Sequence, residues 1–198
     1  MVEAAPRTRL SVNEYLAGEL ASEIRHEYVG GEVYAMVGAS DRHGLIAGNL
    51  FAALRPRLRG TPCQLFMADM KLRVRVAGDT AFYYPDLLLS CDPEDRETYF
   101  RTRPCLVVEV LSETTERIDR REKLYAYTAI PTLQEYLLLS QDRVEAELRR
   151  RAGDGWEVHR ITEGHVSLTC LGLEVPLDAI YEDVPLPGSG LPSASPSR

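Results

Sequence analysis

The stretch "TRPCLVVEVLSETT" at residues 102–115 decides the fold, because it places one carboxylate inside a continuous apolar run. The aliphatic residues on both sides of Glu109 are typical of a strand that is covered on both faces of a sheet. An ionised carboxylate without a partner there costs on the order of several kcal/mol. The sequence therefore predicts a positive group beside Glu109, either a bound cation or a basic side chain such as arginine.

The segments around this strand predict a mixed α/β fold. Residues 115–129 are expected to form a helix that ends before Pro131, and the apolar run at 133–140 is expected to form the next strand. This order makes a strand–helix–strand unit at the centre of the chain. Three further strands are expected to follow in an antiparallel run, at 143–151, 155–161 and 165–171.

The first half of the chain contributes two helices and several strands. Ser11 and Glu14 have the spacing of a capping box, which predicts a helix to about Leu20. The turn dipeptide Gly30-Gly31 predicts a hairpin. A second helix is expected at 41–58, with an apolar stripe made of Leu45, Ala47, Leu50, Leu54 and Leu58.

Residues 64–76 alternate between apolar and polar side chains, which predicts one half-exposed strand with Lys71 on its polar face. A further strand is expected after it, near "AFYYPDLLLS" at 81–90, where Pro85 suits a bulge or a strand edge. Asp86 follows this proline directly. It therefore lies on the strand that precedes the strand of Glu109.

Length and composition favour one domain over residues 1–184, followed by a disordered tail at 185–198 that is rich in Pro and Ser. No apolar segment approaches the roughly 20 residues that span a bilayer, so we expect a cytoplasmic protein without a membrane partner. The net charge of -7 argues against broad, salt-driven nucleic-acid binding and leaves a local basic groove open. The four cysteines stand singly and are expected to be reduced thiols: Cys63, Cys91, Cys105 and Cys170.

Asp86 and Glu109 are the candidate metal ligands. Neighbouring strands lie about 4.8 Å apart, so carboxylates on adjacent strands can share one cation. Mg²⁺ binds oxygen ligands, and one or two carboxylates together with water and a substrate phosphate are sufficient for it. The alternative is a turn aspartate after Pro85 and a buried Glu109 that is paired with an arginine.

An ordered set of motifs carries a resemblance to a known family. It consists of "YPD" at 84–86, "VEVLS" at 108–112 and "DRREKLYAY" at 119–127, and matching pieces run from residue 26 to about residue 158. The set resembles the Uma-type family of endonucleases, a branch of the PD-(D/E)XK nuclease superfamily. The resemblance implies a restriction-endonuclease-like core, in which a mixed β-sheet flanked by helices carries a Mg²⁺-dependent (or Mn²⁺-dependent) phosphodiesterase site.

The superfamily pattern places a lysine two residues after the acidic residue, where this chain has Leu111. Lysine orients the attacking water or balances developing charge, so a neighbouring element can supply it. The candidates are Lys123, which shares a helix stripe with Asp119 and Tyr127, and Lys71. Their alternatives are an exposed ion pair of Lys123 with Asp119 and a solvated strand face around Lys71.

Other residues carry weaker signals. Glu27 is a possible third acidic contact by resemblance to the superfamily. For His43 a local hydrogen bond at the helix start is favoured over a substrate contact, and Tyr83 and Tyr84 are interpreted as packing residues that could stack on a base. Basic groups at 55–59, 73–75 and 149–151 are solvated faces unless they surround the site.

The leading hypothesis is a Mg²⁺-dependent endonuclease that cleaves DNA, with Asp86 and Glu109 holding the metal and Lys123 positioning the attacking water. The alternative is a catalytically inactive nuclease-fold module that acts in nucleic-acid binding or protein assembly. Because cleavage of both strands usually needs two sites, a homodimer is expected.

Overall fold

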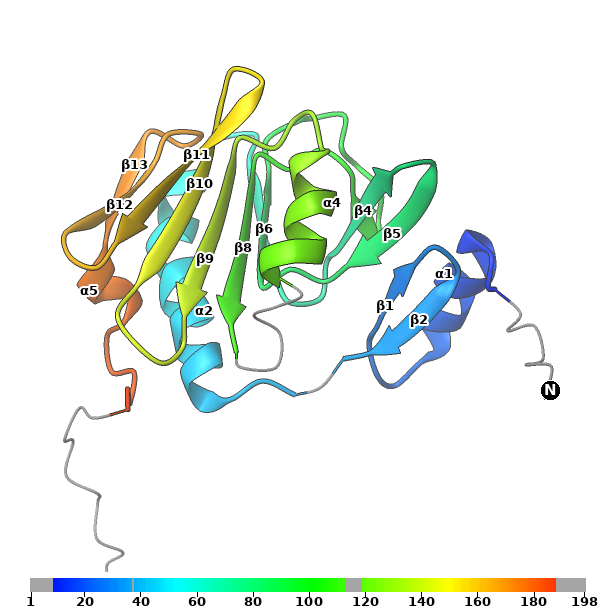
Figure 1. Ribbon diagram of the computed structural model, residues 1–198, viewed down its shortest axis with the longest axis horizontal. Helices are drawn as coiled ribbons and strands as arrows, with labels where there is room; N and C mark the ends of the chain where they lie inside the picture. The colour runs from blue at the N-terminus through cyan, green and yellow to red at the C-terminus, as the bar shows by residue number, and fades with distance from the viewer. Residues whose placement is uncertain (1–8, 37, 113–118, 188–198) are drawn as a thin grey trace, which may run out of the picture.

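The computed structural model describes residues 9–36, 38–112 and 119–187 of the 198-residue chain. It is a mixed α/β fold with two mixed β-sheets (Figure 1). The six-stranded sheet has the order β11 (Gly155–Ile161), β10 (Ala146–Ala152), β9 (Glu135–Ser140), β8 (Leu106–Leu111), β6 (Leu87–Ser90) and β3 (Gln64–Met67). The five-stranded sheet has the order β2 (Glu32–Ala35), β1 (His26–Val29), β5 (Asp79–Tyr83), β4 (Lys71–Val76) and β7 (Phe100–Arg101).

The helices begin where the sequence supplies a cap. Ser11 caps α1 (Val12–Ala21) and forms the predicted capping box with Glu14. Ser40 caps α2 (Asp41–Leu54), which continues into the 3₁₀ turn η1 (Arg55–Leu58). The remaining described helices are the π-helix η2 (Asp119–Lys123), α4 (Leu124–Thr128) and α5 (Leu177–Ile180). In the described part of the chain, no helix has both the length and the apolar composition needed to cross a membrane.

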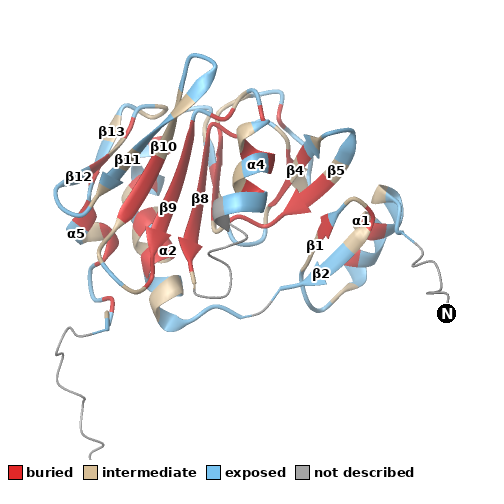
Figure 2. Cartoon of the chain, in the orientation of Figure 1, coloured by how far each residue is buried: buried red, intermediate tan, exposed pale blue. Residues whose placement is uncertain are grey.

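Strand β8 lies at the centre of the core, and all six of its residues are buried (Figure 2). Leu106, Val108 and Val110 pack with α2 on one face of the sheet. Val107 and Leu111 pack with α4 on the other. Because side chains alternate along a strand, Glu109 lies on the face that α4 covers. The parallel pairing of β8 with β9 confirms the predicted strand–helix–strand unit.

Several predictions about elements are wrong. Residues 64–76 form two strands in different sheets, because the chain breaks at Ala68, whose φ is 57°. The buried stripe of α2 contains Ile46 instead of Leu45, which is 38% exposed. The strand at 165–171 is not part of the antiparallel run, since β12 (His165–Leu168) pairs with β13 (Leu173–Pro176) in a separate two-stranded sheet.

The predicted helix at 115–129 is described from Asp119 onward; residues 113–118 lie outside the described residues, as does the tail from residue 188. The single-domain boundary at 184 stays a prediction.

The expectation of four reduced thiols is wrong for two of them. Cys63 and Cys91 form a disulfide, and Cys105 and Cys170 are free thiols. Gln64 pairs with Ser90 across β3 and β6, so Cys63 and Cys91 lie opposite each other one step further along the same register. The sequence could not show this pair, because it depends on the register between strands 28 residues apart.

Candidate functional site

The strands that carry the two acidic residues are neighbours, as predicted. Leu87 pairs with Val108 and Leu88 with Val107, in antiparallel register. One further step places Asp86, which lies just before β6, opposite Glu109. Opposing Cα atoms in an antiparallel pair are about 4.5 to 5.5 Å apart, so the backbones of Asp86 and Glu109 lie side by side at this end of the sheet.

Two partners hold Asp86. The backbone N–H of Val110 donates to Oδ2 over 2.7 Å, and His43 Nε2 lies 2.7 Å from Oδ1. His43 comes from the first turn of α2, where its own backbone N–H donates to Ser40 Oγ. The expected local hydrogen bond of His43 at the helix start is thus present, and its imidazole also contacts a carboxylate 43 residues away in the sequence.

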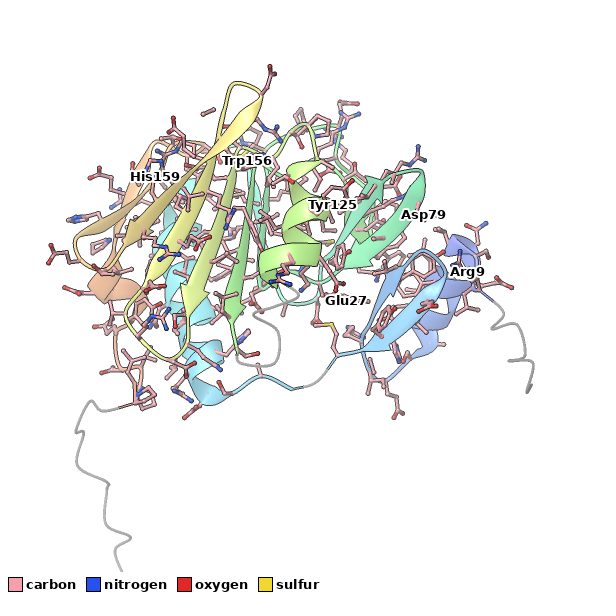
Figure 3. All side chains as sticks on the ribbon, viewed as in Figure 1. Arg9, Glu27, Asp79, Tyr125, Trp156 and His159 are labelled. Atoms are coloured by element: carbon pink, nitrogen blue, oxygen red, sulfur yellow. A yellow bond between two sulfur atoms is a disulfide. The ribbon has the colours of Figure 1, made fainter. Side chains whose placement is uncertain are left out.

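Lys123 supplies the positive group that the sequence requires beside Glu109. Its Nζ lies 3.2 Å from Glu109 Oε1 and 3.1 Å from Glu27 Oε1. Glu109 is 4% exposed and Lys123 is 7% exposed, so this is a buried interaction, and Lys123 is a basic partner of Glu109 among the described residues. Figure 3 shows Glu27 between β1 and the end of α4 nearest to it. The ammonium thus lies between two carboxylates from two different sheets.

Tyr127 adds a second donor to Glu109. Its hydroxyl donates to Oε1 over 2.9 Å. Burial, and then the charge of Glu109, raise the pKa of Tyr127 well above its usual value, so the phenol keeps its proton and remains a donor. The ring is fully buried and packs edge-to-face on Tyr83 and Tyr136. The predicted helix stripe included Tyr127, but its spacing alone does not say which strand residue it meets.

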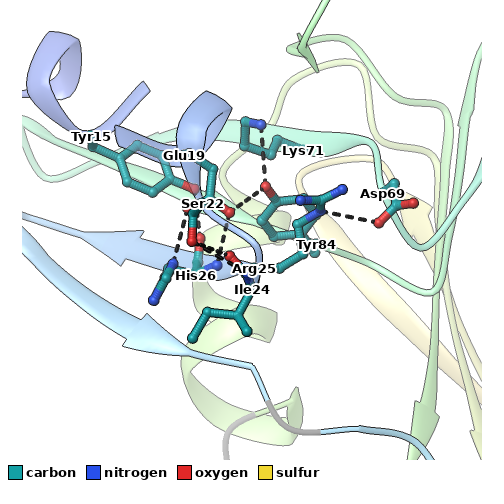
Figure 4. A network of polar contacts seen from close by, with 9 residues as sticks. All are labelled: Tyr15, Glu19, Ser22, Ile24, Arg25, His26, Asp69, Lys71 and Tyr84. Atoms are coloured by element: carbon teal, nitrogen blue, oxygen red, sulfur yellow. Dashed lines mark hydrogen bonds and ion pairs between the residues drawn. The ribbon is translucent and has the colours of Figure 1, made fainter. Parts of the chain in front are cut away.

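Lys71 does not lie on a solvated face, and this expectation is wrong. It is 6% exposed, and its Nζ donates to the hydroxyl of Tyr84 over 3.2 Å. Tyr84 in turn donates to Glu19 Oε1 over 2.8 Å, and Glu19 also accepts from the backbone N–H of His26. Figure 4 shows this network at the junction of α1, β1 and β4.

The network of Lys71 is linked to Glu27 through the backbone of Tyr84. The N–H of Tyr84 donates to Glu27 Oε1 over 3.3 Å. Tyr83 and Tyr84 are buried packing residues, and burial raises the pKa of Tyr83 to about 12. Their rings are therefore in the core and not available to a base.

Several of the other basic side chains make structural contacts with carboxylates, backbone carbonyls or aromatic rings. Arg150 pairs with the buried Glu135, and Arg151 donates to backbone carbonyls of residues 128, 130 and 133. Arg73 packs over Phe82 and Phe100. The side chain of Asp119 lies outside the described residues, so its predicted pairing with Lys123 stays a prediction.

The chemistry of this site is that of an acidic centre next to a buried lysine. Its oxygen donors are the two carboxylates of Asp86 and Glu109, with Glu27 on the far side of the ammonium. Among the described residues, no group of three or more histidine, cysteine, aspartate or glutamate side chains is gathered as a metal centre. A cation here would have two protein ligands and would need water or a substrate to complete its coordination.

Comparisons with known proteins agree with the fold. The family model described as "Putative restriction endonuclease", Uma2, matches residues 12–178. Two uncharacterized proteins of Synechocystis sp., slr1290 and sll1609, are 38% and 31% identical to the chain, over 90% and 78% of its length and 94% and 88% of theirs.

A crystal structure described as a putative nuclease belonging to DUF820, from Anabaena variabilis, superimposes with a TM-score of 0.67 at 14% identity. The match covers 87% of this chain and 97% of that one, and it shows a shared fold. On the extent of the family match and the identity to its relatives, the chain belongs to the Uma2 family.

Proposed function

We propose that this chain is a metal-dependent endonuclease with a restriction-endonuclease-like core, and that it hydrolyses phosphodiester bonds in DNA. One observation carries the proposal: the ammonium of Lys123 lies 3.2 Å from Glu109 Oε1, on the helix that follows the acidic strand. It supplies from a neighbouring element the lysine that is missing at Leu111. Membership in a family described as "Putative restriction endonuclease" supports the same conclusion.

The donor set suits Mg²⁺ or Mn²⁺. Asp86 and Glu109 offer hard carboxylate oxygens from adjacent strands, which are the ligands that these ions prefer. When bound, the ion would lower the pKa of a water molecule and neutralise charge on the scissile phosphate.

The other side chains of the site have positioning roles in this proposal. His43 and the N–H of Val110 hold the two oxygens of Asp86, and the hydroxyl of Tyr127 holds Oε1 of Glu109. Lys123 orients the attacking water and offsets the charge that develops on the phosphate. Glu27 keeps the ammonium in place beside Glu109.

The biological setting is part of the proposal. The substrate is DNA, the protein is cytoplasmic, and a homodimer would bring two sites to the two strands. Salt-dependent attraction to DNA is expected to be weak, because the chain carries a net charge of -7.

A second candidate is a catalytically inactive module that binds nucleic acid or assembles with proteins. The contacts that favour it are those of Glu109: its Oε1 already meets both Lys123 and Tyr127, and the sequence has Leu111 where the motif lysine belongs. On this reading the lysine replaces the metal as the partner of the carboxylate. Metal binding separates the two functions.

The test is nicking of supercoiled plasmid in Mg²⁺ or Mn²⁺ and in EDTA, next to calorimetric titration with Mn²⁺. The endonuclease predicts divalent-dependent nicking that Asp86→Asn and Glu109→Gln abolish, whereas Glu157→Gln, an exposed change on β11, leaves it unchanged. Absence of both Mn²⁺ uptake and nicking, with DNA binding retained, would establish the inactive module instead.

A further inference from the structure

The face of the β1–β2 hairpin that carries Glu27 also carries two apolar side chains. Glu27 pairs with Tyr34 across the two strands. One pair further along, the backbone N–H of Met36 donates to the carbonyl of Arg25 over 2.9 Å. Residues that oppose each other in an antiparallel pair have Cβ atoms about 4.5 to 5.5 Å apart on one face of the sheet. Tyr34 and Met36 therefore lie on the same face as Glu27, whose carboxylate contacts Lys123 Nζ.

These two side chains, which we call the hairpin patch, are open to solvent. Tyr34 is 51% exposed and Met36 is 39% exposed. They belong to the outer edge of the five-stranded sheet, where three of the four residues of β2 are exposed (Figure 2). The hydroxyl of Tyr34 donates to Glu32 Oε2 over 2.8 Å, which holds the phenol along its own strand. Exposed apolar side chains that border a polar site are typical of a surface that contacts a ligand.

Printed contacts connect the hairpin patch to the acidic pair. Arg25, the cross-strand neighbour of Met36, has its Nε 3.2 Å from Asp69 Oδ1. The backbone N–H of Ala68, next to Asp69, donates to the carbonyl of Asp86 over 3.0 Å. The patch is thus two contacts away from Asp86 on one side and, through Glu27, next to Lys123 on the other.

The charges beside the site do not favour a duplex held by its phosphates. Arg25 pairs with Asp69, and Arg42, next to His43 in α2, pairs with Asp142 over 2.9 Å. These aspartates offset the two guanidinium charges, and the chain carries a net charge of -7. Binding through phosphates depends on basic groups that replace the counterions of DNA. Stacking on an aromatic ring needs no such groups, but it requires the face of a base, which a duplex keeps inside its own stack.

We propose that the hairpin patch binds an unpaired nucleobase next to the scissile phosphate, so that the substrate is single-stranded DNA or DNA with unpaired nucleotides where it is cleaved. The proposal rests on the nuclease function proposed above for the identity of the substrate. The base stacks on the ring of Tyr34, and the thioether of Met36 packs beside it. The adjoining phosphate then lies toward Lys123 and the acidic pair. Tyr34 and Met36 are specificity-determining residues in this arrangement.

The test is fluorescence anisotropy of full-length protein with a labelled oligothymidylate and with a blunt duplex of the same length, in EDTA. We expect the single strand to bind at least about tenfold more tightly than the duplex, since only its bases can stack. Because the assay contains no divalent metal, it reports on the patch whether or not the protein nicks plasmid. Single-strand binding without nicking would therefore overturn the proposed nuclease and support the patch.

Variants identify the stacking residue. Tyr34→Ala should weaken single-strand binding by about tenfold without changing its salt dependence, because no phosphate contact is lost. Tyr34→Phe keeps the ring and should bind like wild-type protein. The matched control is Tyr99→Ala, at a site 54% exposed before β7, which should also bind like wild-type protein.

Three results would overturn the proposal: no single-strand binding, a duplex bound as tightly as the single strand, or wild-type affinity in Tyr34→Ala. Should Tyr34→Ala melt early, Met36→Ala decides. It should weaken single-strand binding by about threefold, because the thioether contact with the base is lost. Unchanged affinity in Met36→Ala would then count against the patch.

Discussion

Glu109 shows how a single buried charge organises its surroundings. Its carboxylate meets an ammonium and a phenol within 3.2 Å, both from the helical segment that follows its own strand. Breaking such a buried pair from one side costs on the order of 3 to 5 kcal/mol, because the other charge is left behind. Lys123 is therefore a stabilising residue as well as a candidate catalytic one, and Lys123→Ala is expected to melt earlier than wild-type protein.

The hydroxyl of Tyr127 can be tested separately from its ring. Tyr127→Phe removes the donor to Glu109 and keeps the edge-to-face packing, so we expect a loss of about 1 to 3 kcal/mol in the free energy of unfolding. Nicking should fall by about tenfold, since Glu109 loses one of the groups that orient it. Urea denaturation and the plasmid assay measure the two effects. Tyr125→Phe, at a site 66% exposed on the same helix, is the control, and an equal effect there would contradict the role.

Lys71 makes a prediction about pH. Desolvation lowers its pKa in the folded protein, partly opposed by the charge of Glu19. Between this lowered pKa and the ordinary lysine value of about 10.4, the unfolded chain holds a proton that the folded protein has lost, so the free energy of unfolding rises with pH. Lys71→Met should lose this rise. Urea denaturation of wild-type protein and of Lys71→Met at increasing alkaline pH measures this rise. An equal rise in the two proteins would contradict the lowered pKa of Lys71.

At the scale of elements, Glu19 fastens α1 to the five-stranded sheet. It accepts hydrogen bonds from the backbone of His26 and the hydroxyl of Tyr84, and its own side chain is 3% exposed. Glu19→Ala leaves two buried donors unsatisfied, at about 1 to 3 kcal/mol each. We therefore expect a fall in melting temperature, measured by circular dichroism. Glu23→Ala, an exposed change just beyond the same helix, should leave the melting temperature unchanged, and equal melting of the two variants would refute this role.

Elements with local signals could be predicted from the sequence. The capping box of Ser11 and Glu14 involves residues three apart, and the Gly30-Gly31 turn needs only the positive φ that both glycines adopt. The break between β3 and β4 could not be predicted, since the alternation of side chains continues through it. It occurs at Ala68, an L-residue in the left-handed region that carries no glycine signal.

The candidate site also has a part that could be predicted from the sequence and a part that could not. The family resemblance and the strand order identified Asp86, Glu109 and Lys123 as candidates. The contact of His43 with Asp86 and that of Tyr127 with Glu109 were not predictable, because each depends on how a helix is placed over the sheet. The burial of Lys71 was hidden for a different reason: a charged residue on the polar face of a strand is ordinarily solvated, and here Tyr84 and the α1 residue Glu19 lie beside it.

At the scale of the whole molecule, a metal that binds only the folded protein must stabilise it. At a concentration 100 times its dissociation constant the gain is about 2.7 kcal/mol. We therefore expect Mn²⁺ to raise the melting temperature of wild-type protein and not that of Asp86→Asn or Glu109→Gln. K⁺ at equal ionic strength controls for screening. An equal rise in the two variants would place the metal elsewhere.

The most direct test of the whole account compares Lys123→Ala with Lys71→Ala in the plasmid nicking assay, at a temperature where circular dichroism shows both to be folded. The account predicts that Lys123→Ala does not cleave and still binds Mn²⁺ in a titration, because Asp86 and Glu109 remain. Lys71→Ala should retain most of its activity, since its ammonium contacts Tyr84 and not the acidic pair. Cleavage at the wild-type rate by Lys123→Ala, together with a dead Lys71→Ala, would contradict the account and place the catalytic lysine on β4.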